Sequence, residues 1–538
     1  MSAPQVVAIV GGGIAGLATA ALLAADGHEV HLLERQESLG GRAGSWERDG
    51  FRFDTGPSWY LMPEVFEHFF SLLGRDIDAE LDLRTLDPAY RVFAEGDPAP
   101  VEITADTEAN IALFEAREAG AGERLRAHLS SAAVTERMAR EKFLYTTFAH
   151  LRSLLTPDLV RLLPRLAPLL LQSLESMVAG RFSDTALRQI LGYPAVFLGT
   201  SPGKAPSMYH LMSALDLTGG VQYPMGGFAR LIEVVAELAI DQGVTIHLGA
   251  EATAITTTAR QRGKGRQGHL GPRARVTGVD YVSRGLRRHL EADVVVGATD
   301  LHHVETRLLP PRLQTYPEAW WRKRDPGPGA VLAYLGIRGE LPELSHHSLF
   351  FAADWTTTFA DIDAGRIPGT PSAYVCRPSA TDPDVAPAGD ENLFLLIPVG
   401  ADPAIGHGGL DGQGSPAVEE LVDRMLDEIG ERAGVEDLRE RVVLRRTVGP
   451  ADFASDLNAW RGTMLGPAHT LRQSAMFRAR NASRRVEGLL YAGSGTIPGV
   501  GLPMCLISAE LVLKRLRGDT SLGPLAEPLQ PHEEPVRR

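Results

Sequence analysis

Three glycines and one acid near the start of the chain have the spacing that dinucleotide binding requires. Gly11, Gly13 and Gly16 form a G-x-G-x-x-G pattern, and Glu34 follows. In this pattern the first glycine permits a tight turn, the second lets backbone approach a pyrophosphate, and the third lets a helix pack on a strand. The acid lies about twenty residues on, where it accepts a hydrogen bond from a ribose hydroxyl. These residues predict redox chemistry carried by NAD or FAD.

The elements that must position these residues are readable around them. Residues 6–10 form a short apolar run typical of a buried strand, residues 17–25 form a helix rich in alanine and leucine, and residues 28–33 form a second strand. The amino terminus of the helix supplies amide donors and partial positive charge to phosphates. This βαβ frame predicts a set of cofactor contacts at Gly11, Gly13, Ile14, Ala15, Gly16, Glu34 and Arg35.

The next segment separates NAD from FAD. "SLGGRAGS" places Gly41 and Arg42 after the acid, where a guanidinium can reach a pyrophosphate from the other side. "FRFDTGPSWY" then supplies Gly56, Pro57 and Ser58. In the order ER, GGR and D-x-G the sequence resembles the flavin amine-oxidase superfamily. This resemblance implies that the cofactor is FAD.

A second glycine-rich motif stands near the other end of the chain. In "GLLYAGSGTIPGVGLPMCLISAELVLKRL", residues 488–516, a strand ends at Ala492 and a helix opens near Pro503, a favourable residue for a first turn. Such a helix can direct its amide end at the flavin pyrimidine ring. We therefore expect cofactor contacts at Gly493, Ser494, Gly495, Pro503 and Met504, and the superfamily resemblance adds Ala252, on an expected strand over residues 251–255.

Four segments sharpen the resemblance to bacterial-type phytoene desaturases: "FRFDTGPSWYLMPEVFEHFF", "YPMGG", "DLHH" and "AGSGTIPGVGLPM". The resemblance implies hydride transfer from a long-chain apolar isoprenoid, phytoene or similar, to FAD, with loss of a proton from the neighbouring carbon. Because such a substrate has no polar handle, it requires an apolar tunnel that holds its C–H bond against the flavin. Ile497 is a departure, since many relatives have histidine there.

No catalytic constellation stands out among the polar residues. The sequence shows no paired carboxylates, Ser–His–Asp order or nucleophilic cysteine. Asp54, Glu510 and a water held by the flavin are candidates for a general base. Arg152, in an apolar stretch, either stabilises a developing charge or is solvated.

The expected fold class is α/β: a Rossmann-like FAD-binding domain built from both chain ends, with an inserted mixed-sheet and helical substrate or membrane domain. The expected segments are FAD-binding parts at 1–75, 226–305 and 476–518, a helical substrate or membrane-associated part at 76–225, a substrate domain with antiparallel sheet at 306–475, and a disordered tail at 519–538.

Composition excludes several classes of partner. A net charge of −13 argues against nucleic acid, which needs clustered excess lysine and arginine. Cys376 and Cys505 are far apart, so neither a disulfide framework nor a cysteine metal site is expected, and a cytoplasmic location fits. His302 and His303 are adjacent and lack a spaced partner, so no metal is expected there.

A membrane surface is nevertheless an expected partner, because phytoene lies in bilayers. The chain has no uninterrupted apolar run of about 18 residues, the length that predicts a spanning helix. Residues 159–178, rich in leucine with two interior prolines, fit an amphipathic membrane-dipping element or a helix pair in the core equally well. The basic segment at 259–275 fits a solvated hairpin tip better than a lipid-headgroup contact. The prediction is peripheral membrane association.

Other functions remain open at this level. A carotenoid isomerase, or a desaturase or oxidase of a C30 precursor, would use the same flavin motifs. A prenyl-binding escort protein without catalysis would not need intact phosphate-binding residues. The number of desaturation steps, the electron acceptor (quinone or oxygen) and the oligomeric state are not determined by the sequence.

Overall fold

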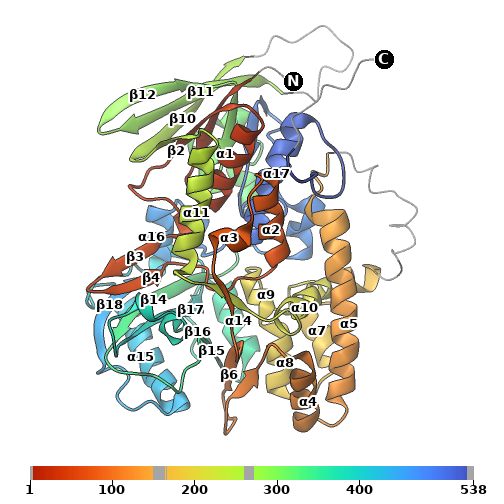
Figure 1. Ribbon diagram of the computed structural model, residues 1–538, viewed down its shortest axis with the longest axis vertical. Helices are drawn as coiled ribbons and strands as arrows, with labels where there is room; N and C mark the ends of the chain where they lie inside the picture. Colours follow the sequence, from red (N-terminus) through yellow and green to blue (C-terminus); the bar gives the residue numbers. More distant parts are fainter. Residues whose placement is uncertain (1–3, 150–163, 165, 260–271, 530–538) are drawn as a thin grey trace.

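The computed structural model describes residues 4–149, 164, 166–259 and 272–529 of the chain. A parallel sheet with its helices forms one lobe, and a larger, mostly antiparallel sheet with a helical bundle forms the other (Figure 1). The red helix α1 (Ile14–Ala25) and the blue helix α17 (Leu502–Arg517) lie side by side in the first lobe (Figure 1). The two ends of the chain therefore build one unit.

The parallel sheet is the base of the cofactor lobe. Its strand order is β20-β13-β1-β2-β9, with bounds Leu489–Tyr491, Val294–Gly297, Val6–Val10, Glu29–Leu33 and Thr245–His247. β1 and β13 are apolar and almost entirely buried, as parallel strands covered on both faces must be. Helices pack on one face: α1, α17, α2 (Pro63–Leu72) and α11 (Gly227–Asp241).

An antiparallel sheet covers the other face. It consists of β10 (Ala250–Ala259), β11 (Ala274–Ser283), β12 (Leu286–Glu291) and the short β19 (Val486–Glu487). Apolar residues of β1 and β2 that point away from α1 join its core, with α12 (Leu301–Arg307) and α13 (Glu318–Trp321). β10 and β11 pair up to Ala259 and Ala274, and residues 260–271 of the predicted basic tip lie outside the described residues.

A seven-stranded sheet forms the second lobe. Its order is β18-β14-β17-β16-β15-β6-β7, with bounds Val442–Val448, Gly329–Ile337, Glu391–Val399, Ala373–Cys376, His347–Phe351, Tyr90–Ala94 and Val101–Ile103. Helix α15 (Pro416–Ala433) packs on one face through its apolar stripe. The opposite face contributes to a core shared with the helices below.

Helices and two small strand pairs complete this lobe (Figure 1). β3 and β4, over Ser45–Arg48 and Phe51–Asp54, form a hairpin, whereas β5 and β8, over Leu83–Thr85 and Gln222–Pro224, form an antiparallel pair between distant segments. The helices are α4 (Thr107–Arg117), α5 (Ala121–Ala139), α7 (Leu174–Ala179), α8 (Thr185–Gly192), α9 (Pro194–Phe197), α10 (Met212–Asp216), α14 (Trp355–Asp363) and α16 (Pro450–Asp456), while α3 (Ile77–Glu80) packs beside α2 in the cofactor lobe.

The mainly helical segment expected at 76–225 also contains β6 and β7. The sequence predicts a strand-like island at residues 90–93, and β6 lies there; its pairing with β15, far along the chain, extends the seven-stranded sheet. Residues 519–529, expected to be disordered, pack on the body: the buried Lys514 Nζ donates to carbonyls of Ser521 and Gly523. Backbone acceptors for one buried ammonium thus order the proximal tail, and residues 530–538 lie outside the described residues.

Candidate active site

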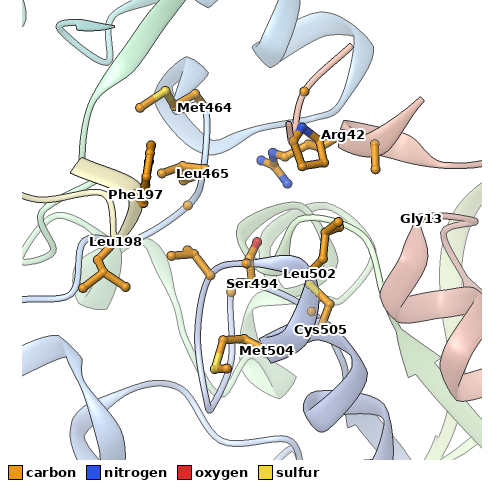
Figure 2. Close-up of a pocket in the computed structure, with 18 of the residues that line it drawn as sticks. Gly13, Arg42, Phe197, Leu198, Met464, Leu465, Ser494, Leu502, Met504 and Cys505 are labelled. Atoms are coloured by element: carbon orange, nitrogen blue, oxygen red, sulfur yellow. The ribbon is translucent and has the colours of Figure 1, made fainter. Parts of the chain in front are cut away.

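A cavity of about 1040 Å³ runs from the glycine turn after β1 to the space between the seven-stranded sheet and the helical bundle. Figure 2 shows its middle portion, with Gly13 and Arg42 on one side and Phe197 and Leu198 on the other. We call the first side the cofactor end and the second the apolar end. The two ends differ in chemistry and are continuous.

Glycines shape the cofactor end by allowing backbone segments to touch. Gly11 has a φ of +111°, and a Cβ there would lie 2.9 Å from the Thr299 nitrogen. A Cβ on Gly16 would lie 1.9 Å from the Gly11 oxygen, so only glycine lets α1 pack on β1. Gly13, which precedes the first turn of α1, has no such contact below 3.7 Å and lines the cavity with Ile14 and Ala15. Its open side leaves room for a phosphate.

The acid after β2 lies where the pattern predicts. Glu34 lines the cavity, and its carboxylate accepts from the amides of Gly12 at 2.6 Å and Gln36 at 2.8 Å. These bonds orient the carboxylate at the edge of the glycine turn. Arg35 donates to the carbonyls of Ser455, at 3.0 Å, and Asp456. Both Arg35 and Ala252, on β10, line the cavity.

Arg42 provides the test of whether this end suits FAD. Its Nε and Nη2 are buried and have no hydrogen-bond partner among the described residues. Burial lowers the pKa of Arg42, and the neighbouring charge of Asp300 opposes that shift. A buried guanidinium with free donors requires an anion. The pyrophosphate of FAD is such an anion, so the residues present fit this cofactor.

The loops beside Arg42 are tightly packed. A Cβ on Gly56 would lie 2.1 Å from the Arg42 oxygen, so the expected loop at Gly56, Pro57 and Ser58 touches the backbone of the GGR segment. Gly41 approaches the turn before α1, where its Cβ would lie 3.3 Å from the Gly13 Cα. All of these positions line the cavity.

The C-terminal motif closes the cofactor end. Gly493, Ser494 and Gly495 line the cavity, as do Pro503 and Met504 in the first turn of α17. This turn contains no acidic residue, so the positive end of the helix dipole is not neutralised there. The structure thus brings the residues predicted to bind the cofactor, from both chain ends and from β10, to one cavity, except Gly16, which packs α1 against the Gly11 backbone and does not line the cavity.

Sequence reasoning missed the residues that hold this loop. Arg478 donates to the carbonyls of Ser494 and Thr496, and the Asn481 amide donates to the carbonyls of Tyr491 and Ile497. His469 Nε2 accepts from the Val500 amide at 3.2 Å. The signal that could have found two of them is "QSAMFRARN", residues 473–481, which concentrates polar side chains just before the last strand.

The apolar end is lined by side chains from distant segments. Figure 2 labels Phe197 and Leu198 near α9 and Met464 and Leu465 from a loop after α16. Beyond them the wall is aromatic and aliphatic, from the seven-stranded sheet and the helical bundle: Trp59, Tyr193, Leu332, Tyr334, Leu349, Phe351, Trp355, Phe359, Phe394 and Leu396. Such a surface binds by apolar burial, without orienting polar groups.

Two buried hydrogen-bond networks lie behind the aromatic wall. Ser58 Oγ bonds the Tyr374 hydroxyl at 2.7 Å, and that hydroxyl bonds His347 Nδ1 at 2.7 Å. The Tyr193 hydroxyl donates to Asp216 at 2.8 Å, and burial raises the pKa of Asp216 to about 7. Ser58, Tyr193 and Tyr374 line the cavity, so both networks reach its wall.

The candidate bases named from the sequence lie elsewhere. Asp54 accepts from the amides of Phe228 and Ala229 at the start of α11, and burial raises its pKa to about 6. Glu510 bonds His68 Nε2 at 2.8 Å and accepts from the Leu525 amide. Neither carboxylate lines the cavity. Arg152 lies outside the described residues.

The histidines and the isoleucine noted in the sequence have local roles. His302 Nε2 bonds Glu318 at 2.7 Å, whereas His303 lines the cavity, and burial lowers its pKa. Ile497 is 1% exposed and belongs to the core beneath the loop.

The two-ended parallel sheet, the glycine turn, the acid at Glu34 and the unpaired Arg42 define an FAD-dependent oxidoreductase. Residues 14–512 match the flavin containing amine oxidoreductase family, and the chain belongs to this family. The predicted flavoprotein class and fold are confirmed.

Relatives narrow the class further. The chain is 40% identical to a carotenoid 3,4-desaturase of Haloarcula japonica, over 95% of this chain and 98% of that one. It is 34% identical to a zeta-carotene-forming phytoene desaturase of Myxococcus xanthus, over 95% and 93%. The expectation of an FAD-dependent carotenoid desaturase, acting on an apolar isoprenoid, is confirmed by these relatives.

Solved structures share the fold. Cyclohexylamine oxidase from Brevibacterium oxydans has a TM-score of 0.56 at 14% identity and covers 95% of this chain and 99% of its own. A putrescine oxidase variant has a TM-score of 0.57 at 15% identity, with 96% and 99% covered. At this level of identity the likeness concerns the fold alone.

Proposed function

We propose that this chain desaturates an acyclic C40 carotenoid at its 3,4 bond. One observation carries the proposal: the cofactor end, which fits FAD, opens without interruption into an apolar chamber long enough to involve two lobes. The relative from Haloarcula japonica, more similar to this chain than the Myxococcus xanthus enzyme, supports the 3,4 position.

In this proposal the cofactor end holds FAD through the predicted contacts, with the pyrophosphate between α1 and Arg42. Bound FAD supplies the hydride acceptor. The chain excludes water from the chamber and aligns an unfunctionalised C–H bond with the cofactor by packing alone. The hydrogen-bonded series of Ser58 Oγ, the Tyr374 hydroxyl and His347 Nδ1 fixes the hydroxyl groups that face this part of the chamber.

Phytoene is the second candidate substrate. Relatives named phytoene desaturase or phytoene dehydrogenase, from Myxococcus xanthus and Streptomyces griseus, are 34% and 33% identical to this chain. Both substrates fit an apolar chamber, and the chamber residues named above do not separate them.

Product analysis tests these assignments. FAD-loaded protein is incubated with liposomes that contain either phytoene or an acyclic C40 carotenoid whose remaining CH2–CH2 unit is at its 3,4 position. Products are analysed by mass and absorbance. Loss of two hydrogens from the second substrate alone supports 3,4-desaturation, and conversion of phytoene supports the second candidate. An unchanged mass with altered absorbance indicates an isomerase. Turnover of a C30 substrate alone, or isoprenoid binding without FAD, would overturn both candidates.

We also propose that the protein docks on a membrane beside the mouth of the cavity. Met476 and Phe477 line the cavity and are 37% and 57% exposed, while Leu171 is 80% exposed. Leu171 belongs to the described part of the predicted membrane-dipping segment, and Leu166 and Leu170 of that segment line the cavity. None of the described helices is long and apolar enough to cross a bilayer.

Charges beside the mouth favour a lipid surface. Arg472 is exposed next to Leu471, which lines the cavity, and its carbonyl accepts from Arg324. Exposed apolar side chains flanked by arginines suit the interface of a bilayer with anionic headgroups. A docked mouth would let an apolar substrate enter without crossing water.

A matched pair of variants tests docking. Phe477→Asp should reduce co-sedimentation with anionic liposomes several-fold, whereas Leu286→Asp, at a residue 60% exposed on β12, should not. Equal sedimentation of both variants and the unchanged protein would contradict docking at the mouth. For the electron acceptor we propose a quinone or oxygen, and anaerobic turnover with and without a soluble quinone distinguishes them.

A further inference from the structure

Arg478 is a buried cation without a counter-charge. Its side chain is 5% exposed. Its Nε donates to the Thr496 carbonyl at 3.0 Å, Nη1 to the Gln473 carbonyl at 3.1 Å and Nη2 to the Ser494 carbonyl at 2.5 Å. Within the described part of the chain it makes no ion pair with a carboxylate. These carbonyls satisfy its donors but leave its charge uncompensated.

The ionisable groups near Arg478 that could become anions do not neutralise it. They are Tyr209 and Cys505, and burial raises the pKa of both, that of Cys505 to about 11. Both are therefore uncharged near neutral pH. Burial lowers the pKa of Arg478 to about 10, so the guanidinium keeps its proton. A buried charge of this kind costs several kcal/mol unless an anion binds nearby.

The position of Arg478 indicates which anion. Its carbonyl partners belong to the loop whose Ser494 and Gly495 line the cavity, next to the first turn of α17. Cys505 in that turn feels the charge of both Arg42 and Arg478, so the two arginines approach one region from different sides. In Figure 2, Ser494 and Cys505 lie below Arg42, with Leu502 and Met504, whereas Leu465 and Phe197 lie to the left of Arg42.

At this boundary between the cofactor end and the apolar end, the cavity lining would hold the reactive ring of a bound flavin, because hydride transfer requires contact with both the cofactor and the substrate. The pyrophosphate carries a constant charge and is matched by Arg42. The ring of a bound flavin would differ, because accepting a hydride from the broken C–H bond, with both electrons, would add one negative charge to it. A fixed cation at the boundary stabilises only the product of that transfer.

We propose that Arg478 is a positioning residue that raises the reduction potential of the bound flavin, by holding a permanent positive charge against the Ser494–Thr496 loop. It exchanges no proton and does not touch the substrate. The positive end of α17 acts in the same direction. The inference rests on FAD binding and is independent of which carotenoid is the substrate.

Two substitutions at Arg478 separate charge from hydrogen bonding. In the FAD-loaded protein, Arg478→Gln should shift the ratio of reduced to oxidised flavin, at equilibrium with a redox dye, about tenfold toward oxidised, which is about 30 mV. Arg478→Lys keeps the charge but cannot form three fork-like bonds, so it should retain most of the potential. Arg287→Gln, which removes an exposed arginine on β12, should leave this ratio unchanged.

Substitutions at Cys505, in the first turn of α17, test the same electrostatic effect without changing Arg478, so a folding defect caused by loss of Arg478 cannot explain their result. Cys505→Asp adds a negative charge where both arginines act, and should lower the potential, whereas Cys505→Ser should not. An unchanged potential in both Arg478→Gln and Cys505→Asp would overturn the proposal. Equal losses in Arg478→Lys and Arg478→Gln would also overturn it, because the hydrogen bonds rather than the charge would then set the potential.

Discussion

The cofactor end and the apolar end of the cavity are built by opposite rules. At the cofactor end, backbone touches backbone, and an added Cβ at Gly16 would lie 1.9 Å from a carbonyl oxygen. At the apolar end, side chains such as Phe197 and Leu465 come from separate segments and form a wall by packing. The cofactor end therefore requires glycines that add no side-chain atoms, whereas the apolar end requires apolar side chains on its wall.

The largest effect is expected at the cofactor end, from Gly16→Ala. The added methyl must displace the Gly11 backbone and with it the phosphate-binding turn. We expect that the purified variant lacks the flavin absorbance near 450 nm, because it does not retain FAD. Gly369→Ala is the control, because a Cβ there has no atom within 4 Å. A flavin-loaded Gly16→Ala protein would show that the close packing of this turn does not limit binding.

The next effect concerns charge at the same end. Arg42→Met removes the unpaired donors and should weaken FAD binding roughly 10- to 100-fold, since hydrogen bonds to a charged group contribute about 1.5–3 kcal/mol. Arg42→Lys keeps the charge, so its affinity for FAD should lie between that of the unchanged protein and that of Arg42→Met. Titration of apoprotein with FAD, followed by protein fluorescence, measures the affinity. Equal affinity of all three proteins would remove Arg42 from the cofactor site.

At the apolar end the same comparison predicts a different result. Leu465→Asp places a carboxylate on the chamber wall, so flavin content should remain and kcat/KM for the carotenoid should fall at least tenfold. Leu465→Met keeps volume and polarity and should retain turnover. Flavin absorbance and product formation are measured on the same samples. If Leu465→Asp lost flavin as readily as turnover, the two ends would not be separable.

The smallest effect is one of stability behind the wall. Burial raises the pKa of Asp216 to about 7 from 3.8, so the folded protein binds this proton more tightly than the unfolded chain. Its contribution to stability is therefore lost as pH rises from about 4 to 7. Asp216→Asn cannot titrate and keeps an oxygen that accepts from Tyr193 and Tyr90. The Tm of the unchanged protein, relative to this variant, should fall between pH 5 and pH 8. A constant difference across this range would contradict a raised pKa for Asp216.

Local motifs made much of the cofactor end predictable. Gly16 and Glu34 act through contacts within one βαβ unit, so their sequence spacing determines their spatial relation. The loop before α17 was predictable for the same reason. Even here, Arg478 escaped notice, because its function depends on carbonyls of a loop that the sequence alone does not place beside it.

The amino-acid sequence by itself determined the cofactor class, since glycine spacing and one acid encode a local backbone geometry that depends little on the remainder of the chain. Only the tertiary structure decided which side chains form the chamber, where Asp54 points, and that Ser58, Tyr374 and His347 meet. Those relations join segments hundreds of residues apart. An apolar sequence pattern does not specify which segment it packs against, because any buried strand or helix of similar shape would satisfy the same pattern.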